Sequence, residues 1–381
     1  MAPRRALRLL DPRPGCLKGP SAQADNPDMP TGNPLVYTVF AALVFIGAVF
    51  GTIAVARVIE RRNRRLTRER LHTLNESWRA HAADGGRAQI VRRQARAADE
   101  SLFWTALETL TLALNRAGWR RLSDALETSR HVVAERRALR DGSPWRRELA
   151  ARRLALLHAR APRRSLRRAL QTGPEAVAYL AALGLAHQRD AWTLRWILDH
   201  PSYFATRPPR ARTGLLRAFG AGAIPMIAAR LSVGTSNSAF ECAMIHRLGA
   251  AGHAPSAGPI AERLGSPELN VRAAAARALG VLGDVAFAGA LLLALRDPEW
   301  EVRAQAARGL GLLGAAEAIP ALAAALTDRS WWVRRHCAYA LARLGVEGNA
   351  ALRGEALVSR DPYARDMAKE ALAWRAARRA A

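Results

Sequence analysis

The hydrophobic pattern of the chain changes abruptly near residue 57. Before it, residues 35–56 form a run of 22 residues without a charge. As a helix rising about 1.5 Å per residue, such a run crosses a hydrocarbon core of roughly 30 Å. From about residue 98 onward, apolar residues recur at helical spacing between short Gly- or Pro-marked turns, without alternating strand patterns. We therefore predict an all-α chain with one transmembrane helix over residues 34–57.

The C-terminal pattern repeats every 31 residues, with related segments starting at Ser266, Asp297 and Asp328. Four columns keep this step: Val271, Val302 and Val333; Leu279, Leu310, Leu341 and Leu372; Leu264, Leu295, Leu326 and Leu357; and the turn glycines Gly252, Gly283, Gly314 and Gly345. Each unit is predicted to be two helices joined by a tight turn, with Asp297 and Asp328 as N-caps. Because neither helix buries its apolar face alone, we predict a right-handed α-solenoid of helical hairpins over residues 141–381.

The unit starting at Asp297, D-P-x-W-x-V-R-x-x-A-A-x-x-L-G-x-L-G, resembles the HEAT-repeat family, and specifically the short HEAT-like repeats of phycobilisome lyase-type proteins. The resemblance covers roughly residues 140–381 and is specific for the last four units. It implies an α-solenoid used as a protein-interaction scaffold. HEAT-like hydroxylases hold a di-iron centre with His-Glu pairs, but none of the nine histidines here is followed by Glu.

Three further segments complete the expected organisation. Residues 1–33 are Pro-rich and patternless and are predicted to be a disordered tail, in which Met29 is an alternative start. Residues 58–97 are predicted to be a basic juxtamembrane helix or linker that is solvated, with a break at Asp84-Gly85-Gly86. Residues 98–140 are expected to form an N-terminal cap of two longer amphipathic helices.

No catalytic or cofactor motif is supported by its context. Gly309, Gly311 and Gly314 spell G-x-G-x-x-G, but a dinucleotide site needs a preceding strand, whereas these glycines close a predicted helix. The three cysteines have no C-x-x-C spacing, and Cys337 occupies a column of small residues that we expect to be buried. The sequence therefore predicts a protein that is not an enzyme and has no cofactor or metal.

Charge is distributed unevenly along the chain, which carries a formal net charge of +26. Residues 57–96 carry +8 and residues 141–172 carry +7, whereas residues 235–327 carry −1. The basic flank after the apolar run predicts that the C-terminal part lies in the cytoplasm, at the inner membrane. A membrane-proximal face contacting anionic lipid is expected from Arg61, Arg62, Arg64, Arg65, Arg147, Arg153, Arg164 and Arg168. Ala54-Val55-Ala56 also resembles a signal-peptidase site, the alternative in which the mature protein is exported.

Candidate contact residues lie in the repeats and in the apolar run. Trp300 and Trp331 share a column of the repeat. Because tryptophan and arginine are favoured interface anchors, the candidates for binding a protein partner are Trp300, Trp331, Trp332, Arg334 and Arg335. The alternative for the tryptophans is packing between the starts of adjacent helices. An arginine also recurs every 31 residues, at Arg272, Arg303, Arg334 and Arg365, and we expect this ladder to tie each unit to acidic or carbonyl groups of the next. Gly47 and Gly51 form a G-x-x-x-G pair, which is typical of a transmembrane dimer face.

These patterns favour a membrane-anchored HEAT-repeat scaffold that binds a protein partner at the cytoplasmic face. One alternative is a nucleic-acid-binding helical repeat protein that uses the arginine-rich half, although nucleic acid is not the expected partner. A second alternative is a HEAT-like enzyme or chromophore lyase.

Overall fold

A computed structural model describes residues 34–86, 88–235 and 237–380, so the predicted tail 1–33 lies outside the described residues. Every regular element in these three ranges is a helix, as predicted. The chain divides between Arg68 and Glu69 into two compact units. Each unit is described by itself, although helix α1 (Pro34–Asp84) continues through the boundary.

In the first unit, α1 holds the predicted apolar segment. Among the described residues, α1 is long and apolar enough to cross a membrane, and none of its apolar window is buried. A second such span would require counting α10 (Pro209–Ala218) and residues 221–233 together, although the chain bends by 99° between them. Gly47 and Gly51 are exposed, and a Cβ atom added at either would meet no atom within 4 Å. The face of α1 that carries these two glycines is therefore uncovered in this unit.

In the second unit, the last part of α1 belongs to the hydrophobic core. Leu74, Trp78 and Ala82 are buried, and the Trp78 ring meets the edge of Phe103 at 5.6 Å. The prediction of a solvated helix is therefore wrong for this stretch, because residues four apart share one helix face. The predicted break is confirmed: α1 ends at Asp84, and Gly85 has a φ of 74°.

Residues 98–140 form three helices rather than the expected two. The additional boundaries arise because Asn115 and Ser129 cap new helices: the Asn115 Oδ1 accepts from Gly118 N at 2.8 Å, and the Ser129 Oγ accepts from Val132 N. These three helices are α3 (Glu100–Leu110), α4 (Arg116–Leu126) and α5 (Arg130–Asp141), and α2 (Ala88–Ala97) precedes them.

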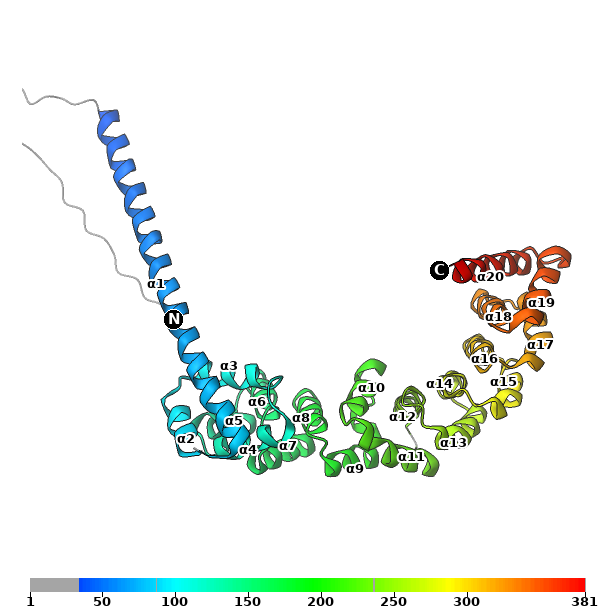
Figure 1. The fold of residues 1–381 in the computed structure, drawn as a ribbon, viewed down its shortest axis with the longest axis horizontal. Helices are drawn as coiled ribbons and strands as arrows, with labels where there is room; N and C mark the ends of the chain where they lie inside the picture. The colour runs from blue at the N-terminus through cyan, green and yellow to red at the C-terminus, as the bar shows by residue number, and fades with distance from the viewer. Residues whose placement is uncertain (1–33, 87, 236, 381) are drawn as a thin grey trace, which may run out of the picture. The chain divides into compact units, whose positions relative to one another are not determined.

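The next helices alternate between two layers (Figure 1). α6, α8 and α10 follow one another in one layer, while α7, α9 and α11 follow in the other. Neighbours approach closely: a Cβ atom added to Gly184 on α8 would lie 2.3 Å from the Ala155 Cβ on α6. The bounds of the helices not yet given are α6 (Pro144–Ala155), α7 (Arg160–Thr172), α8 (Glu175–His187), α9 (Ala191–Asp199) and α11 (Ile224–Val233).

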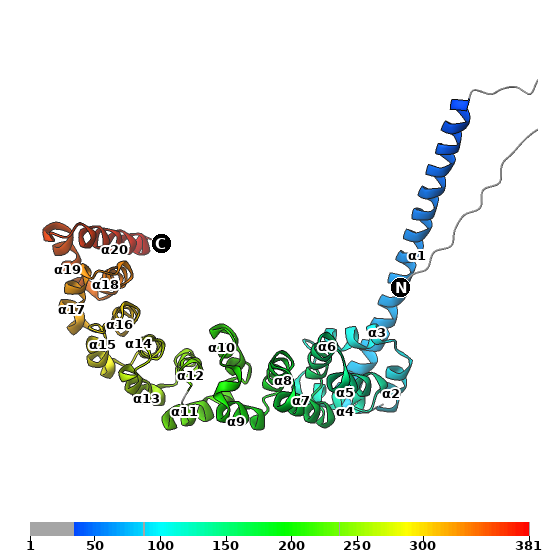
Figure 2. The same ribbon diagram turned by 180° about the vertical axis from the view of Figure 1, so that it is seen from behind.

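The same layers continue through the predicted repeats, as Figure 2 shows from behind. α12, α14, α16 and α18 stack in chain order, and α13, α15, α17 and α19 form the other layer. The turn glycines at 252, 283, 314 and 345 have φ values of 65°, 76°, 72° and 78°, a conformation that glycine adopts without strain. The bounds are α12 (Ser238–Ala250), α13 (Ala257–Glu262), α14 (Leu269–Leu282), α15 (Ala288–Ala294), α16 (Trp300–Leu313), α17 (Ile319–Ala324), α18 (Trp331–Arg343), α19 (Gly345–Val358) and α20 (Pro362–Ala380). The predicted hairpins are therefore confirmed; the handedness of the solenoid stays a prediction.

Most of the predicted columns form the core between the layers. The valine column is fully buried, and the leucines at 279, 310 and 341 are at most 1% exposed. Leu264 and Leu372 are partly buried against the core, whereas the side chain of Leu357 is 83% exposed. Where earlier units have a 3₁₀ turn followed by a short helix, α19 is one straight helix, which changes the direction of its side chains.

The glycines of the G-x-G-x-x-G segment have packing roles. A Cβ atom added to Gly280 on α14 would lie 2.4 Å from the Gly309 Cα on α16. One added to Gly311 would lie 2.6 Å from the Ala340 Cα on α18. Gly314 ends α16 in the left-handed conformation. These glycines therefore allow close contact between successive units.

Candidate interaction surfaces

The arginine ladder of the repeats links neighbouring units through carboxylates. Arg272 donates to Asp297 at 2.8 and 3.2 Å, and Arg303 donates to Asp328 at 2.8 and 2.9 Å. In both arginines the Nη1 donates to two carbonyl oxygens just before its own helix. The four side chains are at most 13% exposed. This supports the expectation that the ladder is structural.

The aspartates of the ladder also organise the start of the following helix. They are not N-caps as expected, since Glu299 and Ser330 hold those positions. Instead, Asp297 and Asp328 each accept from the main-chain N–H two residues later, at 2.9 and 2.8 Å. Burial raises the pKa of Asp328, but the hydrogen bonds from Arg303 and Ser330 outweigh it, so the net pKa is lowered.

The carboxylate pairing stops at Arg334, because Ser359 stands where the next aspartate of the ladder would be. Arg334 Nη1 donates to the carbonyl oxygens of Asp328 at 2.7 Å and Arg329 at 3.2 Å. Its guanidinium lies 5.0 Å from the centre of the Tyr363 ring. Arg334 is 9% exposed, so this candidate for partner binding is held within the fold.

The other four candidates for partner binding are accessible. Trp300, Trp331 and Trp332 are 39%, 42% and 49% exposed. Trp300 begins α16 and Trp331 begins α18, so the indoles lie at the same end of neighbouring helices. Trp331 and Trp332 meet edge to face at 4.7 Å. We call Trp300, Trp331, Trp332 and Arg335 the tryptophan surface.

Arg335 is fixed in place beside the indoles. Its guanidinium lies 5.2 Å from the Trp331 ring and 4.8 Å from the Tyr339 ring. Its Nη1 donates to Glu370 Oε1 at 2.7 Å, and that oxygen also accepts from the Tyr339 hydroxyl at 2.8 Å. The tryptophan surface therefore has an ordered, ion-paired guanidinium at its edge, which lowers the entropy lost on binding.

The eight arginines predicted to form a basic face lie in different environments. Arg61, Arg62, Arg64 and Arg65 are exposed on α1, and Arg64 pairs with Glu60. Arg153 is instead internal, because it pairs with Glu100 and also with Glu135, which is 1% exposed. Its hydrogen bond holds the pKa of Glu100 below the ordinary value. Arg153 is therefore not part of an open basic face.

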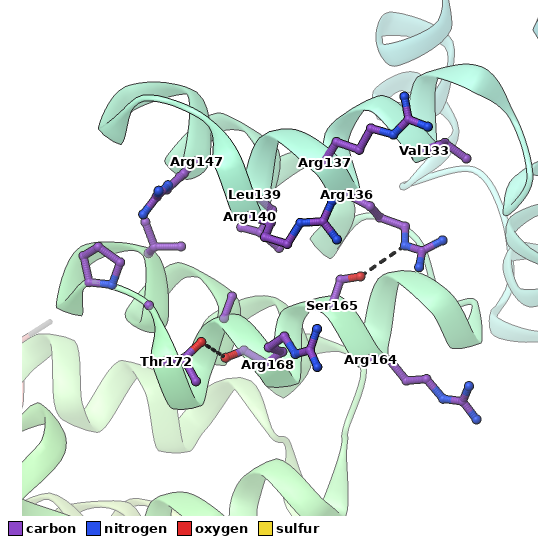
Figure 3. Close-up of a pocket in the computed structure, with 14 residues that line it drawn as sticks. Val133, Arg136, Arg137, Leu139, Arg140, Arg147, Arg164, Ser165, Arg168 and Thr172 are labelled. Atoms are coloured by element: carbon purple, nitrogen blue, oxygen red, sulfur yellow. Dashed lines mark hydrogen bonds between the residues drawn. The ribbon is translucent and has the colours of Figure 1, made fainter.

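Arg147, Arg164 and Arg168 do come together, in a pocket of about 570 Å³ (Figure 3). The pocket is formed by α5, α6, α7 and the start of α8, and its lining contains no carboxylate. We call it the arginine pocket; its six guanidinium groups belong to Arg136, Arg137, Arg140, Arg147, Arg164 and Arg168.

Sequence reasoning missed the three arginines that α5 contributes, because residues 98–140 were taken as a cap. The available signal was their spacing: Arg136 and Arg140 are four apart, as are Arg164 and Arg168 on α7. Residues at this spacing lie on one helix face.

A smaller basic cavity of about 310 Å³ lies between α4, α7 and the α8–α9 turn. His158 lines this cavity together with Arg116 and Arg163. Burial, followed by the positive charges of those two arginines, lowers the pKa of His158 to about 4. The imidazole is therefore neutral at pH 7.

Comparison with known proteins identifies the repeated part of the chain. Residues 287–373 match the family model described as HEAT repeats. The chain contains a HEAT-repeat domain. No curated protein sequence matches the chain.

Solved structures with repeated helices resemble the chain only distantly. An engineered protein is 20% identical, with 56% of this chain and 96% of that chain covered and a TM-score of 0.34. Human deoxyhypusine hydroxylase in complex with glycerol is 18% identical, with 83% and 99% covered and a TM-score of 0.29. A chain from a structure of Kap95p with RanGDP is 14% identical, with 82% and 50% covered and a TM-score of 0.47. At these sequence identities and TM-scores, the resemblance carries no argument about the function of this chain.

The reactive side chains of the HEAT-repeat domain are not activated. Cys337 is fully buried, as expected from its column, and burial raises the pKa of its thiol. Burial and nearby arginines lower the pKa of the adjacent His336. Outside the repeats matched by the family model, burial raises the pKa of Cys242 to about 11. Among the described residues, no group of three or more His, Cys, Asp or Glu side chains is arranged to hold a metal ion.

Proposed function

We propose that this protein is a membrane-anchored scaffold whose HEAT-repeat domain binds a protein partner at the cytoplasmic face of the inner membrane. HEAT repeats are generally protein-interaction scaffolds. The observation that carries the proposal is the tryptophan surface. Three half-exposed indoles and a fixed guanidinium on neighbouring helices have the composition of an interface centre. We also propose that these repeats belong to the lyase-type subfamily of HEAT-like repeats.

Membrane anchoring is supported by helix α1. None of its apolar window is buried, which is stable in lipid but costly in water. The arginines that follow on the same helix, including Arg61 and Arg62, favour a cytoplasmic location and contact with anionic headgroups. The exposed Gly47 and Gly51 offer a face for a homodimer of two such helices.

A protein partner is favoured over nucleic acid by the state of the ladder arginines. Arg272 and Arg303 are neutralised by Asp297 and Asp328 inside the fold. They therefore add nothing to the continuous basic surface that binding of a phosphate backbone needs. The enzyme or chromophore-lyase alternative makes a different prediction, which is stoichiometric metal or pigment in the purified full chain.

The test is to replace the indoles and compare the amounts of cross-linked partners. The full chain carrying Trp331→Ala and Trp332→Ala is expressed in its own cells, cross-linked in the membrane and purified. Proteins recovered with the unaltered chain should fall about tenfold or more, because each central indole contributes about 2 kcal/mol or more to such an interface.

The matched control is Trp145→Ala on α6. Trp145 is 67% exposed, but it lies outside the tryptophan surface, so its loss should leave recovery unchanged. Helical content by circular dichroism confirms that each variant is folded. Equal recovery with both variants would refute the assignment of this surface, and recovery of the chain in the soluble fraction would refute the anchor.

A further inference from the structure

We propose that the arginine pocket is a binding site for phosphate groups. The first argument is uncompensated charge. Six guanidinium groups line the pocket, and among the described residues their carboxylate partner is Asp141, which pairs with Arg140 at 3.0 Å while both side chains are 64% exposed. None of the described residues that line the pocket is a carboxylate.

Three of the six arginines have open donors. The side chains of Arg137, Arg164 and Arg168 make no hydrogen bond or ion pair with any described residue, and all three are exposed. Their mutual repulsion is unfavourable unless an anion lies between them. A ligand that neutralises them therefore gains binding energy without breaking an existing pair.

The backbone holds these groups around one concave space. α5 contributes Arg136 and Arg140 one turn apart, and α7 contributes Arg164 and Arg168 in the same way. Figure 3 shows Arg140 and Arg168 extending into the space between the two helices, with Arg147 at the end of the pocket opposite to Arg164.

Two of the guanidinium groups are positioned by the fold. Arg136 Nε donates to the Ser165 hydroxyl at 3.1 Å, and Arg147 Nε donates to the Gly142 carbonyl at 2.8 Å. These contacts use the Nε donor of each group, and the Nη groups of both make no hydrogen bond with a described residue. Such preorganisation reduces the entropic cost of binding.

The chemistry of the lining selects phosphate among anions. The hydroxyls of Ser165 and Thr172 donate to the main-chain carbonyls of Ala161 and Arg168, so their protons are not available to a ligand. Recognition is left to guanidinium forks, which match phosphate oxygens bidentately. A phosphate monoester brings up to two charges and three acceptor oxygens, and it neutralises the pocket better than a single carboxylate does. The buried side chains of Leu139, Ala169 and Val177 form an apolar floor that strengthens these contacts.

This inference does not rest on the membrane anchor or on the tryptophan surface. The phosphate group belongs either to a lipid headgroup or to a soluble molecule, and the chemistry of the pocket is the same for both. Two probes distinguish the sources: pyrophosphate, and dihexanoyl phosphatidic acid below its micelle concentration. Dihexanoyl phosphatidylcholine has a phosphate masked by a cation and serves as the comparison.

The experiment is calorimetric titration of the full chain in a neutral detergent at physiological salt. The pocket variant is Arg164→Gln with Arg168→Gln. The control is Arg152→Gln with Arg160→Gln, which removes the same charge from exposed positions on α6 and α7 that do not line the pocket. Circular dichroism verifies that both variants fold.

We expect saturable binding of at least one phosphate probe and little binding of phosphatidylcholine. Affinity should fall about tenfold or more in the pocket variant, because charge-assisted hydrogen bonds are lost, and change less than about threefold in the control. Tighter binding of phosphatidic acid than of pyrophosphate assigns the site to lipid, and the reverse order assigns it to a soluble phosphate. The proposal is overturned by the absence of saturable binding of both probes, or by equal weakening in the two variants.

Discussion

Two regions of the Glu69–Ala381 unit contain many arginines in contrasting environments. In α14–α18, each of Arg272 and Arg303 faces a carboxylate of the next unit and is nearly excluded from water. In α5–α8, the arginine pocket collects six guanidinium groups around a space whose lining has no carboxylate. The helices of both regions stack in the same two layers, so the difference does not arise from the architecture.

The contrast shows how the role of an arginine depends on its partner across a repeat interface. An aspartate 25 residues later turns the side chain into a structural tie, as at Arg303 and Asp328. Without that aspartate, the same residue type stays available to solvent or to a ligand, as at Arg168. Arg334 lies between these states, because it keeps the carbonyl contacts but has lost the carboxylate.

The largest effect is expected from breaking one tie of the ladder. Arg303→Ala leaves the carboxylate of Asp328, which is 13% exposed, without its cation, and should lower the free energy of unfolding by about 3 kcal/mol. Hydrogen exchange of the amides in α16 and α18 measures this local loss. The control, Arg168→Ala in the arginine pocket, should change stability by about 0.5 kcal/mol or less. Similar losses at both positions would remove the distinction between the two regions.

A second, smaller effect tests what the two regions share, which is close contact between helices. Gly280→Ala places a Cβ atom 2.4 Å from the Gly309 Cα, and Gly184→Ala places one 2.3 Å from the Ala155 Cβ. Each should cost about 1–3 kcal/mol of stability, because the neighbouring helix must move. Urea unfolding followed by circular dichroism measures both.

The control for these glycines is Gly289→Ala on α15, where an added Cβ atom meets nothing within 4 Å. This substitution should leave the free energy of unfolding unchanged or raise it by up to about 1 kcal/mol. A loss at Gly289 as large as at Gly280 would show that helix contact is not the cause.

The smallest expected effect concerns pH and the positive charge of the arginine-rich region. The pKa of His158 is lowered to about 4, so the unfolded chain binds more protons than the folded chain between about pH 4 and 6.5. Stability should therefore fall as the pH drops through this window. The loss should be about 1 kcal/mol after allowance for solvent screening, since the ring is incompletely buried. Thermal melts of His158→Gln should show a flatter pH dependence over the same window.

The acid response that Asp328 contributes to the repeats should begin at lower pH. The net pKa of Asp328 is below its ordinary value, so the stability it contributes is present above about pH 4 and is lost as the pH falls through the folded-state pKa. His336 on α18 also has a lowered pKa, so the test is made in the His336→Gln variant, in which the protection of the α16 and α18 amides from exchange should hold between pH 6.5 and 4. Acceleration there at pH 5 would contradict the assignment of Asp328 as the titrating group.

The sequence by itself determined the features that depend on local spacing. The 31-residue period located the turns, the valine and leucine columns and the glycine contacts, because helical hairpins repeat with fixed phase. The period was wrong for Leu357, where α19 is a single α-helix. The prediction of a solvated helix was wrong for Trp78, which enters the core although its neighbours are basic. The burial of each of these side chains depends on which helix packs against it.

Only the tertiary structure decided which charges are neutralised. Arg153 and Arg168 belong to the same basic run, yet Arg153 meets Glu135 from α5 while Arg168 faces other arginines. Arg140 and Arg168 are distant in sequence and line one pocket only because α5 packs against α7. Electrostatic interactions act over distances of several ångström between helices, so spacing along one helix does not fix them.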